Sequence, residues 1–381
     1  MTVLEWWLVL AALLVWLPTV GYFVALELAL RLRGDRRPPP DPASWPPVAV
    51  VLPVRDEETW IDDRLRDFAR LDYPPDRLEL WVVDGGSRDR TVARIEAAAT
   101  DDPRMQLLRI EDSRSKMEQI RLALEKLRTP VAVVTDADVA LAPETIRALV
   151  RVLEDDPGTA LVGAHIEPDT PLLEERLHWW LLDRLWWLEG EVLGAAGVAA
   201  PCYALRPDLL REALPADVTA DDVHLALIAG SRGWRVRRAP TARVRELRVP
   251  RTAAELLRYR RRRGGGFVQE VRTFLWRDGL GLRFRAALAL RYWQLRIVPR
   301  LALGLLVAAP TLAGVRGVFG LAVLAAAVGL PLVVASRTSD AFADSRRPAW
   351  RLPLAGLRLL AANALALLVP GHDGSRPRGG P

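Results

Sequence analysis

The chain has 381 residues, half of them hydrophobic, with a formal net charge of +6 and one cysteine. This length suffices for one large domain together with membrane segments, and the single cysteine excludes a disulfide within the chain. Both ends are apolar and the middle is charged, so the basic balance favours a lipid partner over nucleic acid.

The amino-terminal segment is predicted to cross a membrane. Residues 6–26 carry no charge and are long enough for a hydrocarbon core of about 30 Å. Arginines follow directly, which predicts that the next domain faces the cytoplasm. A cleaved signal peptide is the alternative, disfavoured by the length of the run and by the lack of a preceding basic residue. We therefore assign residues 1–30 to a transmembrane helix and 31–46 to a basic, proline-rich linker.

Residues 47–275 alternate between apolar runs and amphipathic segments, as expected for a chain that alternates strands with helices. The expected strands are 48–54, 78–83, 105–110 and 131–135; the expected helices are 57–70, 88–99, 116–127 and one from 143. This order predicts an α/β domain with a mostly parallel sheet. Functional side chains are expected where the strands end.

Asp136 and Asp138 directly follow the apolar strand 131–135. Two carboxylates at this spacing can hold Mg²⁺ or Mn²⁺, with nucleotide phosphates completing the coordination shell. An acidic, solvated turn is the alternative, and the buried strand ahead of the motif favours the metal.

Two further polar clusters also lie at the end of an expected strand or at the start of an expected helix. Asp84 ends the second strand and precedes two glycines, which allow a ligand to approach the backbone; an ordinary strand-to-helix turn is the alternative. Asp221 and Asp222 precede an apolar helical run, where one carboxylate can take a proton from an attacking hydroxyl. Here the alternative is capping of the helix.

An arginine cluster at residues 258–263 surrounds Tyr259 and precedes three glycines. Arginines bind diphosphate oxygens through paired hydrogen bonds. The alternatives are a basic patch at the membrane surface and a nucleic-acid patch, and the second lacks the expected broad stripe with interleaved aromatics. Tryptophans within residues 172–189 either line an acceptor site, face the membrane or pack in the core. The four histidines show no metal-ligand spacing.

The carboxyl-terminal third is again apolar. Residues 276–300 are predicted to form an interfacial amphipathic segment, 301–370 two or three transmembrane helices, and 371–381 a tail. The expected spans are 301–315 and 317–336, and residues 352–370, which contain Arg358, form either a further span or a helix lying in the interface.

Taken together and in this order, the clusters resemble the family 2 glycosyltransferases of GT-A fold, and more narrowly their membrane-bound branch. The resemblance covers about residues 48–266. It implies a Rossmann-like, mostly parallel catalytic domain flanked by transmembrane helices. It also implies donor-binding roles for a set of residues near the base, the ribose and the diphosphate. These are Pro53, Arg55, Glu57, Asp84, Lys116, Asp136, Arg260, Arg262 and Arg263.

The same resemblance implies roles for the remaining motifs. Asp138, with Asp136, takes the place of the metal ligands. Asp222 takes the place of the catalytic base, and Asp221 stands where relatives have Glu. The acceptor-side segment corresponds to the stretch that contains Tyr203 and Arg206. Gly85 replaces a second acidic residue of the base-binding motif.

Relatives that build polymers processively carry Gln-x-x-Arg-Trp, whereas this chain has Tyr259 and Arg263 at the outer positions and keeps Arg262. The resemblance therefore implies a non-processive, inverting transfer from a nucleotide-diphosphate sugar, a UDP-sugar in relatives, to a hydroxyl of a lipid-linked or glycan acceptor. The expected place is the cytoplasmic face of the cell membrane, in a multi-pass protein of the cell envelope that binds no nucleic acid. A polyprenyl-phosphate glycosyltransferase and a non-catalytic membrane scaffold are the alternatives.

Overall fold

The structure is a computed structural model. It describes residues 3–34, 39–195, 200–210, 218, 220–313, 355–356, 358–359 and 362–363. The chain divides into two compact units. The sheet unit comprises residues 25–170 and 179–249, and the helical unit comprises 1–24, 171–178 and 250–381.

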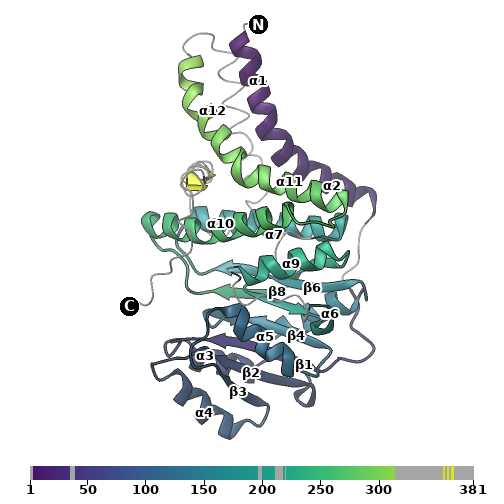
Figure 1. The fold of residues 1–381 in the computed structure, drawn as a ribbon, viewed down its shortest axis with the longest axis vertical. Coiled ribbons are helices and arrows are strands. Elements are labelled where there is room, and N and C mark those ends of the chain that lie inside the picture. The colour runs from purple at the N-terminus through teal and green to yellow at the C-terminus, as the bar shows by residue number, and fades with distance from the viewer. Residues whose placement is uncertain are drawn as a thin grey trace. The chain divides into compact units, whose positions relative to one another are not determined.

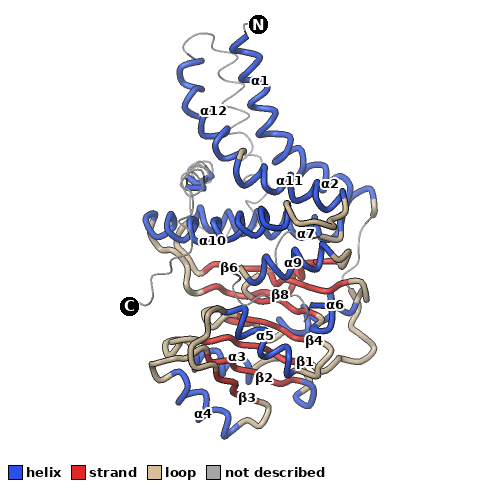
Figure 2. The backbone as a smooth tube through the Cα atoms, viewed as in Figure 1, coloured by secondary structure: helices blue, strands red, loops and turns tan. Residues whose placement is uncertain are grey.

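The sheet unit is built on an eight-stranded sheet of order β3-β2-β1-β4-β7-β6-β8-β5 (Figures 1 and 2). Its first half comprises β1 (Val48–Val54), β2 (Leu78–Asp84), β3 (Met105–Arg109) and β4 (Val131–Thr135). These four strands are parallel to one another. Every residue of β1 and β4 is buried, which explains their continuous apolar sequence.

The helices that connect these strands pack against the sheet and against each other. They are α3 (Ile61–Ala69), α4 (Thr91–Asp101) and α5 (Lys116–Lys126), and a further helix, α6 (Thr145–Glu154), leads into the second half of the sheet. Each buries an apolar face, for example Ile120 and Leu124 of α5. The predicted α/β class and the predicted strands and helices of residues 48–154 are confirmed, with boundaries that differ by a few residues.

The second half of the sheet is mixed, which the sequence did not indicate. It comprises β5 (Val139–Leu141), β6 (Thr159–Pro168), β7 (Cys202–Leu205) and β8 (Arg235–Glu246). Strand β7 runs antiparallel between β4 and β6, whereas β6 and β8 are parallel. Strand β8 contains Arg237 and Arg238, which are only 5% and 3% exposed. They form ion pairs with Glu191 and Asp183, so their charge is compensated inside the fold.

The amino-terminal helix is continuous but irregular. It consists of α1 (Val3–Trp16), a π-helical turn η1 (Leu17–Gly21) and α2 (Tyr22–Leu32). Pro18 lacks the N–H that would bond to the carbonyl of Leu14. The indole of Trp293, on α11 (Leu282–Arg296), donates to that carbonyl at 3.2 Å, and Gln294 donates to the carbonyl of Pro18 at 2.5 Å. The turn is therefore supported from a neighbouring helix of the same unit.

The end of α2 is fixed to α7 (Leu173–Leu193) within the sheet unit. Arg184 of α7 binds both carboxylate oxygens of Glu27 at 2.7 Å. Arg33 donates to the carbonyls of Glu191 and Val192 at the end of α7, where a helix has carbonyls without helical partners.

Within the described residues, one helix is long and apolar enough to cross a membrane, Val9–Leu32, with a mean hydropathy of 2.2. A signal sequence near the amino terminus would meet the same criterion. Trp6, Trp7 and Leu17 expose about 60% of their surface (61%, 64% and 57%), and exposed apolar surface of this extent marks an interaction site.

The carboxyl-terminal predictions are covered only in part. Helix α12 (Val298–Ala313) coincides with most of the predicted run 301–315, and α11 lies inside the predicted interfacial segment. The predicted run 317–336 and most of 352–370 lie outside the described residues.

Candidate active site

Strand direction brings the predicted acidic clusters to one edge of the sheet, which we call the carboxyl edge. Because β1, β2 and β4 are parallel neighbours, the residues that follow them emerge at this edge. Strand β7 is antiparallel to β4, so its first residue, Cys202, lies beside the last residue of β4, Thr135. Helix α9 (Asp221–Ser231) presents its first turn here, since Asp221 accepts a hydrogen bond from Tyr203 of β7.

Lys116 links Asp136, a predicted metal ligand, to the Asp221–Asp222 pair, which contains the predicted catalytic base. Its ammonium lies 2.5 Å from Asp136 Oδ1 and 3.0 Å from Asp221 Oδ2. Burial alone would lower the pKa of Lys116, but the charges of Asp136 and Asp221 outweigh it and raise the pKa. Burial raises the pKa of Asp136, and Lys116 opposes that shift. The two carboxylates thus depend on one shared cation.

Asp221 and Asp222 have different environments although they are adjacent. Asp221 is buried, and its Oδ2 accepts a hydrogen bond of 2.9 Å from the Tyr203 hydroxyl as well as the contact from Lys116. Burial, reinforced by Asp221, raises the pKa of Tyr203 well above its usual range, so Tyr203 stays a donor. Asp222 is half-buried, and its Oδ1 accepts from the N–H of Val223 at 2.8 Å. Of the two, Asp222 is the more accessible to a substrate.

Asp138 contacts an arginine that sequence reasoning missed. Arg248 Nε lies 3.5 Å from Asp138 Oδ2, and Arg248 Nη2 lies 2.5 Å from Glu57 Oε2. Burial raises the pKa of Glu57, Arg248 opposes this, and Asp138 adds to it. Arg248 lies two residues beyond the end of β8, in a stretch where the sequence shows none of the motifs considered above.

The loops after β1 and β2 are joined by hydrogen bonds. Asp84 is 1% exposed, and its carboxylate accepts from the N–H groups of Gly86 and Ser87 at 3.1 Å each. The N–H of Asp56 donates to Ser87 Oγ at 2.9 Å. Gly86 has φ of +90°, and a Cβ there would lie 2.2 Å from the carbonyl oxygen of Glu111, so only glycine fits.

The side chain of Gln119 explains why residue 85 is a glycine. Gln119 Nε2 donates to the carbonyls of Val54 and Val83 at 2.8 Å each, which links the ends of β1 and β2. A Cβ on Gly85 would lie 2.6 Å from that nitrogen. The buried Gln119 therefore occupies the space that a larger residue at position 85 would need.

The other predicted donor residues differ in position. Pro53 is inside β1 and buried. Arg55 extends from the end of β1 to the loop before α5, where it donates to the carbonyl of Ser113 at 2.9 Å and to Asp112 at 3.2 Å. Arg55 thus closes one side of the carboxyl edge.

Arg206 lies away from this edge, contrary to the acceptor-side expectation. Because β7 is antiparallel to β4, Leu205 pairs with Ala132 near the start of β4, and Arg206 follows at the opposite edge of the sheet. Its side chain donates to the carbonyls of Thr159 and Leu153 and pairs with Glu154 at 3.0 Å. Tyr203 is fully buried under Asp221, so it supports that carboxylate from below.

The arginine cluster lies on α10 (Ala253–Leu275) in the helical unit. Arg260 is buried and forms an ion pair with the fully buried Glu175, so the charge of Arg260 is neutralised inside the protein. Arg262 and Arg263 lie over the ring of Tyr259, at 5.9 and 4.8 Å from its centroid. Among the tryptophans of α7, Trp179 and Trp186 pack edge to face in the core.

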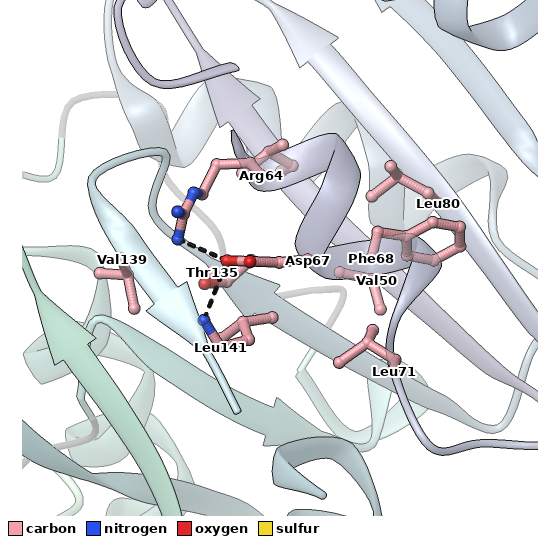
Figure 3. Close-up of a pocket in the computed structure, with 10 residues that line it drawn as sticks. Val50, Arg64, Asp67, Phe68, Leu71, Leu80, Thr135, Val139 and Leu141 are labelled. Atoms are coloured by element: carbon pink, nitrogen blue, oxygen red, sulfur yellow. Dashed lines mark hydrogen bonds and ion pairs between the residues drawn. The ribbon is translucent and has the colours of Figure 1, made fainter. Parts of the chain in front are cut away.

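An enclosed pocket lies between α3 and the sheet (Figure 3). Its lining is mainly apolar, and its volume of about 10 Å³ leaves room for roughly one water molecule. Asp67 forms an ion pair with Arg64 at 2.7 Å and accepts a hydrogen bond from the N–H of Leu141 at 3.3 Å. These contacts hold β5 just after the metal motif, so the pocket is part of the scaffold.

The carboxyl edge fits a divalent cation in its chemistry. Within the described residues, no group of three His, Cys, Asp or Glu side chains converges on one point as a complete metal site. Asp136 and Asp138 supply hard oxygen ligands, and the carboxylates at this edge outnumber Lys116 and Arg248, which contact them. A cation that takes its remaining ligands from a nucleotide diphosphate is compatible with this set.

Comparison with known proteins identifies the domain. Residues 49–197 match the family described as glycosyl transferase family 2. The chain is 24% identical to the mannosyltransferase PcManGT from Pyrobaculum calidifontis, solved in complex with GDP-Man and Mn²⁺, with a TM-score of 0.67 over 95% of this chain and 98% of that one. Residues 49–197 therefore match a family 2 glycosyltransferase domain, and the chain shares the GT-A fold of that mannosyltransferase.

Two curated relatives match over shorter stretches. The chain is 29% identical to the beta-monoglucosyldiacylglycerol synthase of Synechocystis sp., over 31% of this chain and 24% of the relative. It is 26% identical to an N-acetylglucosaminyltransferase of Mesorhizobium japonicum, over 58% of this chain and 55% of the relative. The matched stretch thus spans between a quarter and about half of these relatives.

Replacing Gly85 with Asp should destabilise the domain by about 1–3 kcal/mol, because the new side chain displaces Gln119 from the two strand ends. The double variant Gly85→Asp, Gln119→Ala should recover part of that loss. Thermal unfolding of the detergent-solubilised protein measures both. Gly281→Asp, at a helix start with open space around it, is the matched control and should be neutral; equal losses at both sites would contradict the explanation.

Replacing Lys116 with Met should lower the free energy of unfolding by about 1–3 kcal/mol, less than for a fully buried pair, since 30% of the Lys116 side chain is exposed. The pKa of Asp136 is already raised, and loss of the cation raises it further. A carboxyl group whose pKa is higher in the folded state favours folding at low pH, and that contribution is lost as the pH rises through the folded pKa. The deficit of the variant relative to wild type should therefore grow from acidic to neutral pH. Lys126→Met, on the exposed end of α5, is the control; a deficit independent of pH would count against the shared cation.

Proposed function

We propose that this chain is an inverting glycosyltransferase that moves one sugar from a nucleotide-diphosphate sugar to a hydroxyl of a lipid-linked or glycan acceptor. The observation that carries the proposal is the convergence of Asp136, Asp138 and the Asp221–Asp222 pair at one edge of the sheet, joined through Lys116. Together with the match to glycosyl transferase family 2, this supports metal-ligand roles for Asp136 and Asp138 beside a base in the Asp221–Asp222 pair.

The donor is proposed to lie along the carboxyl edge. The nucleoside would contact the loops after β1 and β2, which contain Pro53, Arg55, Glu57 and Asp84. A UDP-sugar is the proposed donor, on family resemblance. When bound, Mg²⁺ or Mn²⁺ held by Asp138 and Asp136 supplies positive charge that stabilises the departing diphosphate.

Asp222 is the proposed general base. It takes the proton of the acceptor hydroxyl as that oxygen bonds to the anomeric carbon and the bond from this carbon to the diphosphate oxygen breaks. A single displacement from the opposite face inverts the carbon. Asp221, held by Tyr203 and Lys116, fixes the first turn of α9 and thereby the position of Asp222.

Arg262 and Arg263 are the proposed partners of the leaving nucleotide, by resemblance to the arginine motif of relatives. Arg260 is left out of this role because Glu175 already neutralises it in the interior. Arg263 replaces the tryptophan of processive relatives, which supports transfer of one sugar rather than synthesis of a polymer.

We further propose that the apolar segments hold the catalytic domain at the cytoplasmic face of the cell membrane. The exposed apolar surface of Val9–Leu32 supports an anchor, and a lipid-linked acceptor would reach the site from the bilayer. The multi-pass arrangement rests on the apolar runs of the sequence.

A polyprenyl-phosphate acceptor is the second candidate. A phosphate nucleophile is ionised at neutral pH and needs no base, so this reaction would tolerate loss of Asp222. Replacement of Asp222 therefore separates the two acceptor classes.

Asp222→Asn should lower kcat by about 100- to 10,000-fold, the usual contribution of a general base, while nucleotide binding is retained. The assay measures sugar transfer by detergent-solubilised protein, with the nucleotide-sugar that a hydrolysis screen with Mn²⁺ selects. Asp76→Asn, whose side chain is 78% exposed, is the control. Full activity of the Asp222 variant would reject the base and favour the phosphate acceptor.

Asp138→Asn should weaken Mn²⁺-dependent binding of the nucleotide at least about ten-fold, since even a residue that only supports a metal ligand costs that much when lost. Calorimetric titration of UDP and GDP, with Mn²⁺ and then with excess EDTA, measures this effect. The wild type should lose binding with EDTA, whereas the variant should bind weakly in both conditions. Equal, metal-independent binding by both proteins would reject the metal site.

A further inference from the structure

Arg248 is positioned against two residues of the proposed donor site and has no role in the reaction as proposed above. It lies two residues beyond β8, and its guanidinium contacts Glu57 at 2.5 Å and Asp138 at 3.5 Å. The backbone beside it is fixed, because the N–H of Leu247 donates to the carbonyl of Asp138 at 2.9 Å and Val139 pairs with Glu246.

The two partners of Arg248 are more buried than Arg248 itself. The side chains of Glu57 and Asp138 are 13% and 19% exposed, whereas that of Arg248 is 54% exposed. A guanidinium with an anchored backbone and an open face can turn about its long side chain while it keeps one of its two carboxylate partners.

The charges make this movement relevant to the metal. Arg248 Nε lies near the Oδ2 oxygen of Asp138, the carboxylate proposed as the principal metal ligand. A divalent cation on Asp138 and the guanidinium repel each other unless anionic oxygens lie between them. A nucleotide diphosphate supplies such oxygens, and arginine binds them in a paired geometry.

We propose that Arg248 is a donor-binding residue that shields Asp138 in the empty site and moves onto the diphosphate when the metal and the nucleotide bind. Glu57 tethers the guanidinium during this exchange. The inference rests on the proposed function. It predicts that the site has a lower affinity for a metal ion alone than for a metal ion together with a nucleotide.

The test measures two affinities in the full chain. Arg248→Gln should bind Mn²⁺ without nucleotide about two- to five-fold more tightly than wild type, because a competing surface ion pair is removed. The same variant should bind UDP or GDP in the presence of Mn²⁺ roughly ten- to a hundred-fold more weakly, because a charged hydrogen-bond donor to the diphosphate is lost. Titration followed by the electron paramagnetic resonance of free Mn²⁺ gives the first value, and calorimetry gives the second.

Two further variants separate this role from a structural one. Arg243→Gln, at a surface ion pair between β8 and Glu167 of β6, removes the same charge and should change neither affinity. Arg248→Lys keeps the charge, so its binding of Mn²⁺ alone should match wild type while its nucleotide affinity falls in part.

The outcomes distinguish this inference from the proposed function. If wild type binds neither UDP nor GDP with Mn²⁺, both ideas fail. If wild type binds and Arg248→Gln has the same two affinities, only the role of Arg248 fails. Weaker binding of Mn²⁺ alone by Arg248→Gln would also overturn it, since Arg248 would then be supporting Asp138 in its metal-binding position.

Discussion

The contact of Lys116 with Asp136 and Asp221 is the interaction on which the site depends. It connects three elements that are far apart in the chain: the start of α5, the end of β4 and the start of α9. Without that ammonium, two carboxylates would face each other in a poorly solvated place, where like charges are costly. Lys116 thus lets Asp136 and the Asp221–Asp222 pair approach each other at the carboxyl edge.

The antiparallel strand β7 has two consequences for the same network. It places Tyr203 under α9, where the hydroxyl donates to Asp221, and it directs Arg206 to the other edge of the sheet. A buried tyrosine that donates to a buried carboxylate compensates some of the lost hydration. The free thiol of Cys202 beside it is buried, and burial raises its pKa to about 12, so it is a packing residue rather than a nucleophile.

The sequence predicted the first half of the sheet because β1 and β4 are buried on both faces and therefore read as continuous apolar runs. It did not predict β6 and β8. Strand β8 carries Arg237 and Arg238, whose partners Glu191 and Asp183 lie on α7, far away in the chain. A charge that is buried by a distant partner looks like a surface charge in the sequence alone, so hydropathy patterning fails at such strands.

The site shows the same division between local and distant information. Asp136, Asp138 and Asp222 could be proposed from the sequence because each lies beside a local signal, a strand end or a helix start. Gln119 and Arg248 were missed because their roles come from partners more than 30 residues away, such as the carbonyls of Val54 and Val83 or the carboxylate of Glu57.

Gly85 is understood only when the local sequence and its distant structural partner are considered together. Its sequence shows the loss of an acidic residue from the base-binding motif, and the structure shows that Gln119 fills the adjoining space and ties β1 to β2. An amide that satisfies two strand-end carbonyls does so without the charge that an aspartate would bring beside Asp84. The proposed nucleoside end of this site is therefore less acidic than the motif of relatives implies. In the proposed complex, recognition of the base would depend more on backbone groups and on Asp84 alone.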